Sequence, residues 1–175
     1  MEPPTKKIED ESRGITYHEN IDVDKLQQIV KKVSDSKITF AMVTCPNPHL
    51  QTFDVIESAE KEGGIAAIRT EKELRKYFED FRKLFIQKTN DQNTGWYIPY
   101  DFGFYLDEDK EDFRSNLFVI VFIPESLNPR AKVFYSVELK SFSATVKIAK
   151  TITITNVNQL TYENLLWHAK GYQTY

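Results

Sequence analysis

Two runs of aromatic and β-branched residues constrain the fold of this 175-residue chain more than any other feature. The first is Tyr97–Leu106 (YIPYDFGFYL) and the second is Leu117–Ile123 (LFVIVFI), with the acidic, hydrophilic segment Asp107–Asn116 between them. Residues of this kind are enriched in strands because they pack well on a pleated surface. The two runs therefore predict an antiparallel hairpin with a long loop.

Four segments have apolar residues at the spacing of an amphipathic helix. One begins at Asp24, and a second follows Thr70, which can form a capping box with Glu73. A third runs over Asn128–Lys150, with the asparagine as cap and a proline in the first helical position, and a fourth spans Tyr162–Lys170. The residues expected to face the core are Leu26, Ile29, Val30 and Val33 in the first helix, Leu74, Tyr77, Phe78, Phe81, Leu84 and Phe85 in the second, Leu139, Phe142, Val146 and Ala149 in the third, and Leu165, Leu166 and Ala169 in the fourth.

Shorter runs predict the remaining strands. Ile38–Cys45 is typical of a buried strand, and Gln51–Glu57 and Ile65–Ile68 are expected to follow it, divided by a turn at Gly63-Gly64. Thr151–Val157 alternates and predicts an edge or half-exposed strand. Interleaved strands and helices predict an α/β or α+β fold, with a central mixed sheet of about five or six strands and helices on both faces.

The length fits a single domain. Residues 1–13 (MEPPTKKIEDESR) are polar and charged, so we expect a flexible N-terminal tail, a domain over residues 14–171 and a C-terminal tail over residues 172–175. The N-terminus lacks the apolar core of a secretory signal. The longest apolar stretch, Leu117–Ile123, is far shorter than the ~18 residues that suggest a membrane span. These features predict a cytoplasmic protein, which we expect to be a monomer.

The charges of the chain nearly balance, with 23 Lys and Arg against 26 Asp and Glu and a net charge of -3. Domains that bind nucleic acid by neutralising phosphates usually carry a clear basic excess, so this composition disfavours that class. Cys45 is the single cysteine, which excludes an internal disulfide.

No residue pattern indicates catalysis, a metal or a cofactor. The histidines His18, His49 and His168 are scattered and lack metal-ligand spacing, and Cys45 has no predicted neighbour that would activate its thiol. The few glycines form no phosphate-binding pattern, and the acidic segment between the two aromatic runs lacks the spacing of a calcium loop. We therefore predict that the protein is not an enzyme and needs no cofactor.

One predicted helix start breaks a local rule. Arg130 and Lys132 lie in the first turn of the helix capped by Asn128. The partial positive charge at a helix N-terminus disfavours cations there by some tenths of a kcal/mol each. A rule broken without local compensation often marks a functional surface.

Three segments, in this order and spacing, resemble the actin-depolymerising-factor homology domain of cofilins: Tyr97–Phe104, Leu117–Pro124 and Arg130–Ser136. In that family a Tyr-x-x-Tyr-Asp-Phe-x-Tyr strand precedes a strand ending in Ser-Pro, and a basic-x-Lys-Met-x-Tyr-Ala segment then opens the long actin-binding helix. The resemblance covers about Arg13–Gly171. It implies the gelsolin-like fold of that family, a cytoskeletal location and regulation of actin filament turnover by binding monomers or filaments, without covalent chemistry.

By this resemblance Arg130 and Lys132 match the basic pair that contacts monomeric actin. Val133 takes the place of the usual methionine, and Val133 and Phe134 are expected to supply apolar burial or support. The family inserts this helix into the cleft between two actin subdomains.

The filament-binding surface of the family is less complete in this chain. Arg114 matches one basic position of the hairpin strand, but Asn116 replaces the other, and Trp167-His168 stands where the family carries an acidic-basic pair in the terminal helix. We therefore expect weakened filament binding and severing.

The N-terminal regulatory serine of the family falls at Arg13 when Gly14-Ile15 is aligned, with Ser12 beside it. The resemblance thus places an N-terminal regulatory or contact segment at Ser12, Arg13 and Gly14, without the usual serine position.

Two other functions compete with direct binding to actin. The chain also resembles the glia maturation factor branch, which keeps the fold but targets the actin-branching complex. The pair Arg130 and Lys132 favours actin, because that branch typically lacks it, whereas the altered filament surface and the segment Ala149–Leu166 favour the branch. An enzyme whose site is invisible in one sequence is the third alternative.

Overall fold

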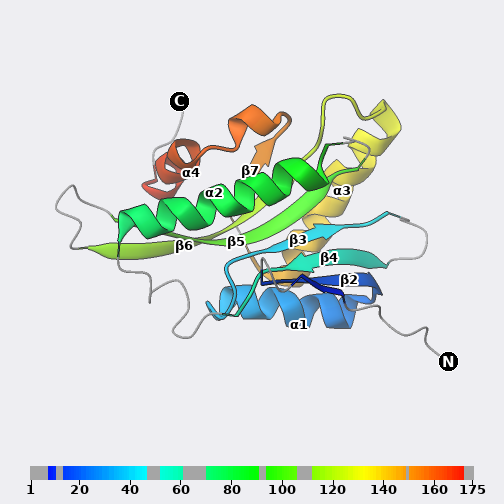
Figure 1. The fold of residues 1–175 in the computed structure, drawn as a ribbon. Helices are drawn as coiled ribbons and strands as arrows, with labels where there is room; N and C mark the ends of the chain where they lie inside the picture. The colour runs from blue at the N-terminus through cyan, green and yellow to red at the C-terminus, as the bar shows by residue number, and fades with distance from the viewer. Residues whose placement is uncertain are drawn as a thin grey trace.

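A mixed sheet with the strand order β1-β2-β4-β3-β5-β6-β7 forms the centre of the computed structural model, and helices cover both of its faces (Figure 1). The structure describes residues 8–10, 14–46, 52–60, 70–90, 94–105, 112–148 and 150–171, and the side chains of residues 8–10, 139–141 and 143–146 lie outside this description. The strands are β1 (Ile8–Asp10), β2 (Ile15–Ile21), β3 (Ala41–Thr44), β4 (Phe53–Glu57), β5 (Trp96–Tyr105), β6 (Phe113–Phe122) and β7 (Thr151–Ile154); the helices are α1 (Val23–Ser34), α2 (Glu71–Lys88), α3 (Pro129–Val146), the short 3-10 helix η3 (Val157–Gln159) and α4 (Tyr162–Ala169).

The two aromatic runs form the predicted hairpin. β5 and β6 pair antiparallel along their whole length, beginning with Trp96 opposite Phe122. β7 lies parallel to β6, with Val119 opposite Thr151, because α3 returns the chain to the same end of the sheet. The fold class predicted from the sequence is confirmed. In the described residues the sheet has seven strands, where the sequence predicts about five or six.

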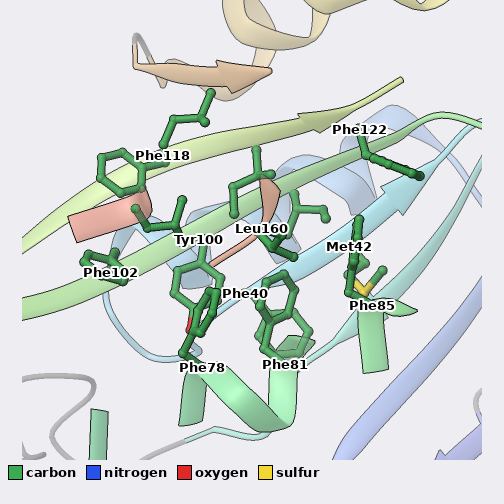
Figure 2. Packing of buried hydrophobic residues seen from close by; sticks show 14 of the residues in the cluster. Phe40, Met42, Phe78, Phe81, Phe85, Tyr100, Phe102, Phe118, Phe122 and Leu160 are labelled. Atoms are coloured by element: carbon green, nitrogen blue, oxygen red, sulfur yellow. The ribbon is translucent and has the colours of Figure 1, made fainter. Parts of the chain in front are cut away.

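The pleat of β6 sends alternate side chains into two separate cores. Phe118, Ile120 and Phe122 face α2 and α4, whereas Val119 and Val121 face α1 and α3. Figure 2 shows the first core, in which rings from α2 and from the strands of the sheet pack together. Each helix therefore buries its apolar stripe against one face of a shared sheet.

The aromatic stripe of α2 is held against the sheet from its first turn. Thr70 Oγ1 accepts a hydrogen bond from the N–H of Glu73 over 3.2 Å, as the predicted cap requires. Further along, the Phe81 ring centroid lies 4.9 Å from that of Tyr100. Burial of one such side chain contributes roughly 1.5–3 kcal/mol. Tyr77 departs from the predicted core set, since it lies on the flank of the stripe and is 39% exposed.

β2 is a strand that the sequence analysis does not predict. It carries the buried His18, whose Nε2 lies 2.8 Å from Glu57 Oε2 on β4. Lys32 of α1 donates to the other oxygen of this carboxylate over 2.7 Å. Burial by itself raises the pKa of Glu57, but the hydrogen bonds from His18 and Lys32 outweigh it and lower that pKa. The strand is thus stabilised by a hydrogen-bonded cluster of His18, Glu57 and Lys32 as well as by its buried apolar residues.

The predicted N-terminal tail contains a short strand. β1 pairs antiparallel with β2, with Ile8 opposite Tyr17, inside the segment 1–13 that the sequence predicts as a tail. Hydrogen bonds between the two backbones satisfy the peptide groups there, so a strand forms although the segment is largely polar. The remaining domain limits stay predictions.

Several sequence predictions fall outside the described residues. They are the strand Ile65–Ile68, the turn Gly63-Gly64, His49, Ala149 and the side chains of Leu139 and Val146. In the part of the chain that the structure describes, no helix is long and apolar enough to cross a membrane.

Candidate functional site

The start of α3 is fixed in place by its own cap. Leu127, just before the helix, is buried in the core that α1 and α3 share. Asn128 Oδ1 accepts a hydrogen bond from the N–H of Ala131 over 2.8 Å, and its carbonyl accepts one from the N–H of Lys132 over 3.1 Å. Pro129 occupies the first helical position, where its missing N–H is no loss. The predicted cap and first residue of this helix are confirmed.

Tyr135 anchors the second turn of α3 to the sheet. Its hydroxyl lies 2.6 Å from Thr94 Oγ1, and Tyr97 donates a hydrogen bond from its hydroxyl to the Tyr135 carbonyl over 2.6 Å. The Tyr135 ring covers Gly95 so closely that a Cβ added there would lie 2.8 Å from it. Gly95 therefore allows the helix to approach the start of β5.

The outward face of α3 carries an apolar ridge. Side chains rotate by about 100° per residue around a helix. Since the buried Tyr135 and Phe142 point to the sheet, Val133 points to the opposite side. Val133 is 63% exposed, and Val137, one turn later, is 59% exposed. Sequence analysis missed Val137, although its spacing of four residues from Val133 places both on one face.

Two cations flank this ridge. Arg130 is exposed and Lys132 is half-buried, and they lie about 160° apart around the helix, so the ridge separates them. The first turn of α3 contains no acidic residue. Neither cation forms an ion pair or a side-chain hydrogen bond with another residue in the described part of the chain. The positive charge at this helix start therefore remains available to a partner.

Phe134 supports the ridge from one side. It is half-buried against the core between α1 and α3, and its ring centroid lies 5.1 Å from that of Tyr135 in an edge-on arrangement. The structure thus brings together four residues that the sequence predicts, and Val137 extends them. We call Arg130, Lys132, Val133, Phe134 and Val137 the α3 surface.

The residues predicted for filament binding lie on β6 and near the C-terminal end of α4. We call Arg114, Asn116 and His168 the second surface. Asn116 Nδ2 donates a hydrogen bond to the carbonyl of Ala169 over 2.7 Å. Lys150 Nζ donates to the carbonyl of His168 over 2.6 Å. Arg114, further toward the hairpin tip, is exposed and lies 3.1 Å from Asp112. Asn116 and Lys150 thus hold α4 to the sheet. The amide at position 116 therefore has a structural role.

His168 adds little positive charge to this second surface. Partial burial and the nearby Lys150 ammonium lower the pKa of its imidazole below the usual 6.5. Its ring packs edge-on against Trp167, with centroids 5.0 Å apart. The imidazole is therefore mainly neutral at neutral pH.

Gly14 is the described member of the predicted N-terminal segment; Ser12 and Arg13 lie outside the described residues. Gly14 adopts φ +64°, and a Cβ added there would lie 2.9 Å from the Cβ of Ala59. A glycine is required at this position for both backbone and packing reasons.

The described residues contain no group of three or more His, Cys, Asp or Glu side chains placed to hold a metal ion. Cys45 is buried, and burial, together with the nearby Glu138 and Asp54, raises the pKa of its thiol. A thiol in such surroundings is a poor nucleophile.

The sequence matches a known protein family. The family described as cofilin/tropomyosin-type actin-binding protein matches residues 23–170. This chain belongs to that family. The match to the cofilin-type family extends from α1 to the end of α4 and contains the whole α3 surface, whereas Gly14 precedes it.

Solved structures share the cofilin-type fold at low sequence identity. The ADF-like UNC-60A protein of Caenorhabditis elegans is 13% identical, with a TM-score of 0.60 over 81% of this chain and 88% of that one. The ADF/cofilin of Trypanosoma brucei is 17% identical, with a TM-score of 0.58 over 84% and 91% of the two chains. The glia maturation factor of Caenorhabditis elegans is 12% identical, with a TM-score of 0.53 over 82% and 90%. No curated protein sequence matches the chain.

Proposed function

We propose that this cofilin-type chain binds monomeric actin through the α3 surface and regulates filament turnover at the cytoskeleton, with little binding to filaments. One observation carries this function. Two cations without partners in the described chain flank an exposed apolar ridge on a helix whose start is fixed by Asn128 and Tyr135. A few residues usually dominate an interface, and arginine is enriched among them.

The α3 surface suits an acidic partner such as actin. The guanidinium of Arg130 can engage a carboxylate with two hydrogen bonds, while the ammonium of Lys132 acts as a point charge. Val133 and Val137 lose contact with water when the partner covers them. Because α3 is already helical, binding requires little further loss of backbone conformational entropy. The activity consists of binding and involves no covalent step.

The second surface supports the expectation of weak filament binding. Asn116 and Lys150 donate their hydrogen bonds to carbonyls of α4 rather than to an outside partner. The imidazole of His168 is mainly neutral, and Arg114 lies beside Asp112. Arg114, Asn116 and His168 therefore offer little free positive charge to a filament, although Lys150 keeps its ammonium charge.

An adaptor that acts on the actin-branching complex is the alternative function. The altered second surface favours it, and the basic pair of the α3 surface favours actin. The similarity to glia maturation factor, at 12% identity, concerns the fold alone.

Two assays on the unmodified chain test the proposed function. We expect titration of fluorescently labelled monomeric actin to give saturable binding, and co-sedimentation with filaments to leave most of the chain in the supernatant. Strong pelleting with filaments would contradict the weakened second surface. Absence of binding to both forms of actin, together with binding to the branching complex, would contradict the function and support the adaptor.

A further inference from the structure

Among the described residues β7 forms one edge of the sheet, with β6 as its neighbour on one side. The N–H groups of Val119 and Ile123 on the β6 side bind the carbonyls of Lys150 and Ile154. In a parallel pair the backbone groups of alternate residues face the same side, so those of Thr151 and Thr153 point away from β6. Both threonines are exposed, whereas Ile152 and Ile154 are buried.

Apart from its short length of four residues, β7 carries none of the residues that discourage pairing with another strand. Natural edge strands carry charged residues, prolines or bulges that discourage pairing. Residues 151–155 read Thr-Ile-Thr-Ile-Thr, without a charge, a proline or a glycine, and both residue types favour strands. A groove of about 370 Å³ lies beside β7 and is lined by polar side chains that include Asn158, Asn164 and His168. This groove leaves space beside the edge on the α4 side.

We propose that two copies of this chain associate by antiparallel pairing of their β7 strands, centred on Thr153. The segment 151–155 reads the same in both directions, so this register places Thr153 opposite Thr153 of the second copy and each isoleucine opposite an isoleucine. The outward backbone groups then meet in hydrogen-bonded pairs. Opposed threonines also stabilise a strand pair.

The association is weak because the paired segment is short. The N–H of Thr155 already binds Gln159 Oε1 over 2.7 Å, so the ladder of hydrogen bonds ends there. Stable interfaces usually bury about 1,200–2,000 Å², more than a few paired residues supply. We therefore expect a dimer that forms at high protein concentration and dissociates on dilution.

Cysteine cross-linking tests both the pairing and its register. In the proposed dimer the two residues at position 153 lie about 5.5 Å apart, whereas those at position 151 lie about 14 Å apart. We expect Thr153→Cys, treated with a short thiol-specific cross-linker, to yield at least tenfold more covalent dimer than Thr151→Cys. Ser34→Cys on α1 and the unmodified chain, whose Cys45 is buried, measure random cross-linking. Equal yields for the two β7 variants would overturn the register.

Sedimentation velocity over a range of concentrations tests the dimer without cross-linking. Thr153→Lys places two cations opposite each other at the centre of the pair, so we expect at least a tenfold rise in the dimer dissociation constant. Circular dichroism verifies that the variant is folded. A monomer at all concentrations, or a dimer that Thr153→Lys leaves unchanged, would overturn the proposal. Because neither experiment uses actin, their failure would leave the proposed actin binding unaffected.

Discussion

The ring of Tyr135 covers Gly95 so closely that a Cβ at position 95 would lie 2.8 Å from it. This contact joins α3 to the start of β5. It sets the direction in which the side chains of Arg130, Lys132 and Val133 project from the surface. The orientation of the α3 surface therefore depends on a glycine that lies outside it in the sequence.

Replacing Gly95 by alanine should displace Tyr135 and α3. Overpacking of this kind usually costs about 1–3 kcal/mol. We expect Gly95→Ala to lower the free energy of unfolding in urea by that amount and also to weaken binding to monomeric actin. Tyr135→Phe is the matched control: it keeps the ring but loses the hydroxyl contact with Thr94, which costs about 1 kcal/mol and should leave actin affinity nearly unchanged. Unchanged stability of Gly95→Ala would contradict the packing described.

An aspartate in place of Val133 should weaken binding to actin without a large change in the stability of the fold. Val133 is largely exposed, so Val133→Asp should change the free energy of unfolding by no more than about 0.5 kcal/mol. We expect its affinity for monomeric actin to fall at least tenfold, because the variant loses an apolar contact and adds an anion facing an acidic partner. Ile86→Asp on α2, also an exposed apolar position, should bind actin like the unmodified chain. Equal losses for both variants would indicate a nonspecific effect of charge.

Asn116 should contribute to stability more than to filament binding. Asn116→Ala removes the hydrogen bond to the Ala169 carbonyl, so urea unfolding should show a loss of about 1 kcal/mol. Arg114→Ala removes an exposed ion pair and should cost less than about 0.5 kcal/mol. Neither substitution should change co-sedimentation with filaments. A clear loss of pelleting for Arg114→Ala would show that the second surface is active.

Asp101 should make stability depend on pH. It lies in β5, is 3% exposed, and its Oδ2 has no hydrogen-bond partner. Burial raises the pKa of this carboxyl to about 6, although a hydrogen bond with Ser36 opposes the shift. The unfolded chain releases the proton nearer pH 4. Stability conferred by the protonated form is therefore present below about pH 4 and is lost as the pH rises to about 6, by roughly 2–3 kcal/mol in total.

Asp101→Asn should remove this dependence. Urea unfolding should show that the variant gains stability relative to the unmodified chain between pH 4.5 and pH 7.5, because it has no carboxylate to keep buried at the higher pH. Asp80→Asn, at an exposed position of α2, is the control for removing one carboxyl elsewhere. If the difference in stability between Asp101→Asn and the unmodified chain is the same at both pH values, the carboxyl of Asp101 does not titrate as described.

The helices could be predicted from the sequence because each shows a local pattern. α1 and α4 begin and end close to the predicted positions, since their apolar stripes and caps lie within a few residues of one another. β2 could not be predicted in this way. The Nε2 atom of its buried His18 is hydrogen-bonded to Glu57, 39 positions away, and such a long-range contact leaves no local pattern.

The candidate site also combines residues that could be predicted from local patterns with residues that could not. Arg130 and Lys132 were found because they break a local rule at a helix start, and Val133 and Phe134 adjoin them. The role of Asn116 could not be predicted, because its partner Ala169 lies 53 positions away and is bonded through its backbone carbonyl. The contact between Gly95 and Tyr135 could not be predicted either, since it depends on how α3 crosses the sheet.

The affinity of Arg130→Ala/Lys132→Ala for monomeric actin tests the proposed function most directly. Loss of a charge at a buried contact costs about 2–5 kcal/mol, so we expect the dissociation constant of the double variant to rise at least about a hundredfold. Lys72→Ala/Lys76→Ala removes two exposed cations from α2 and should bind like the unmodified chain. Unchanged affinity of the folded Arg130→Ala/Lys132→Ala variant would contradict the assignment of the α3 surface to actin.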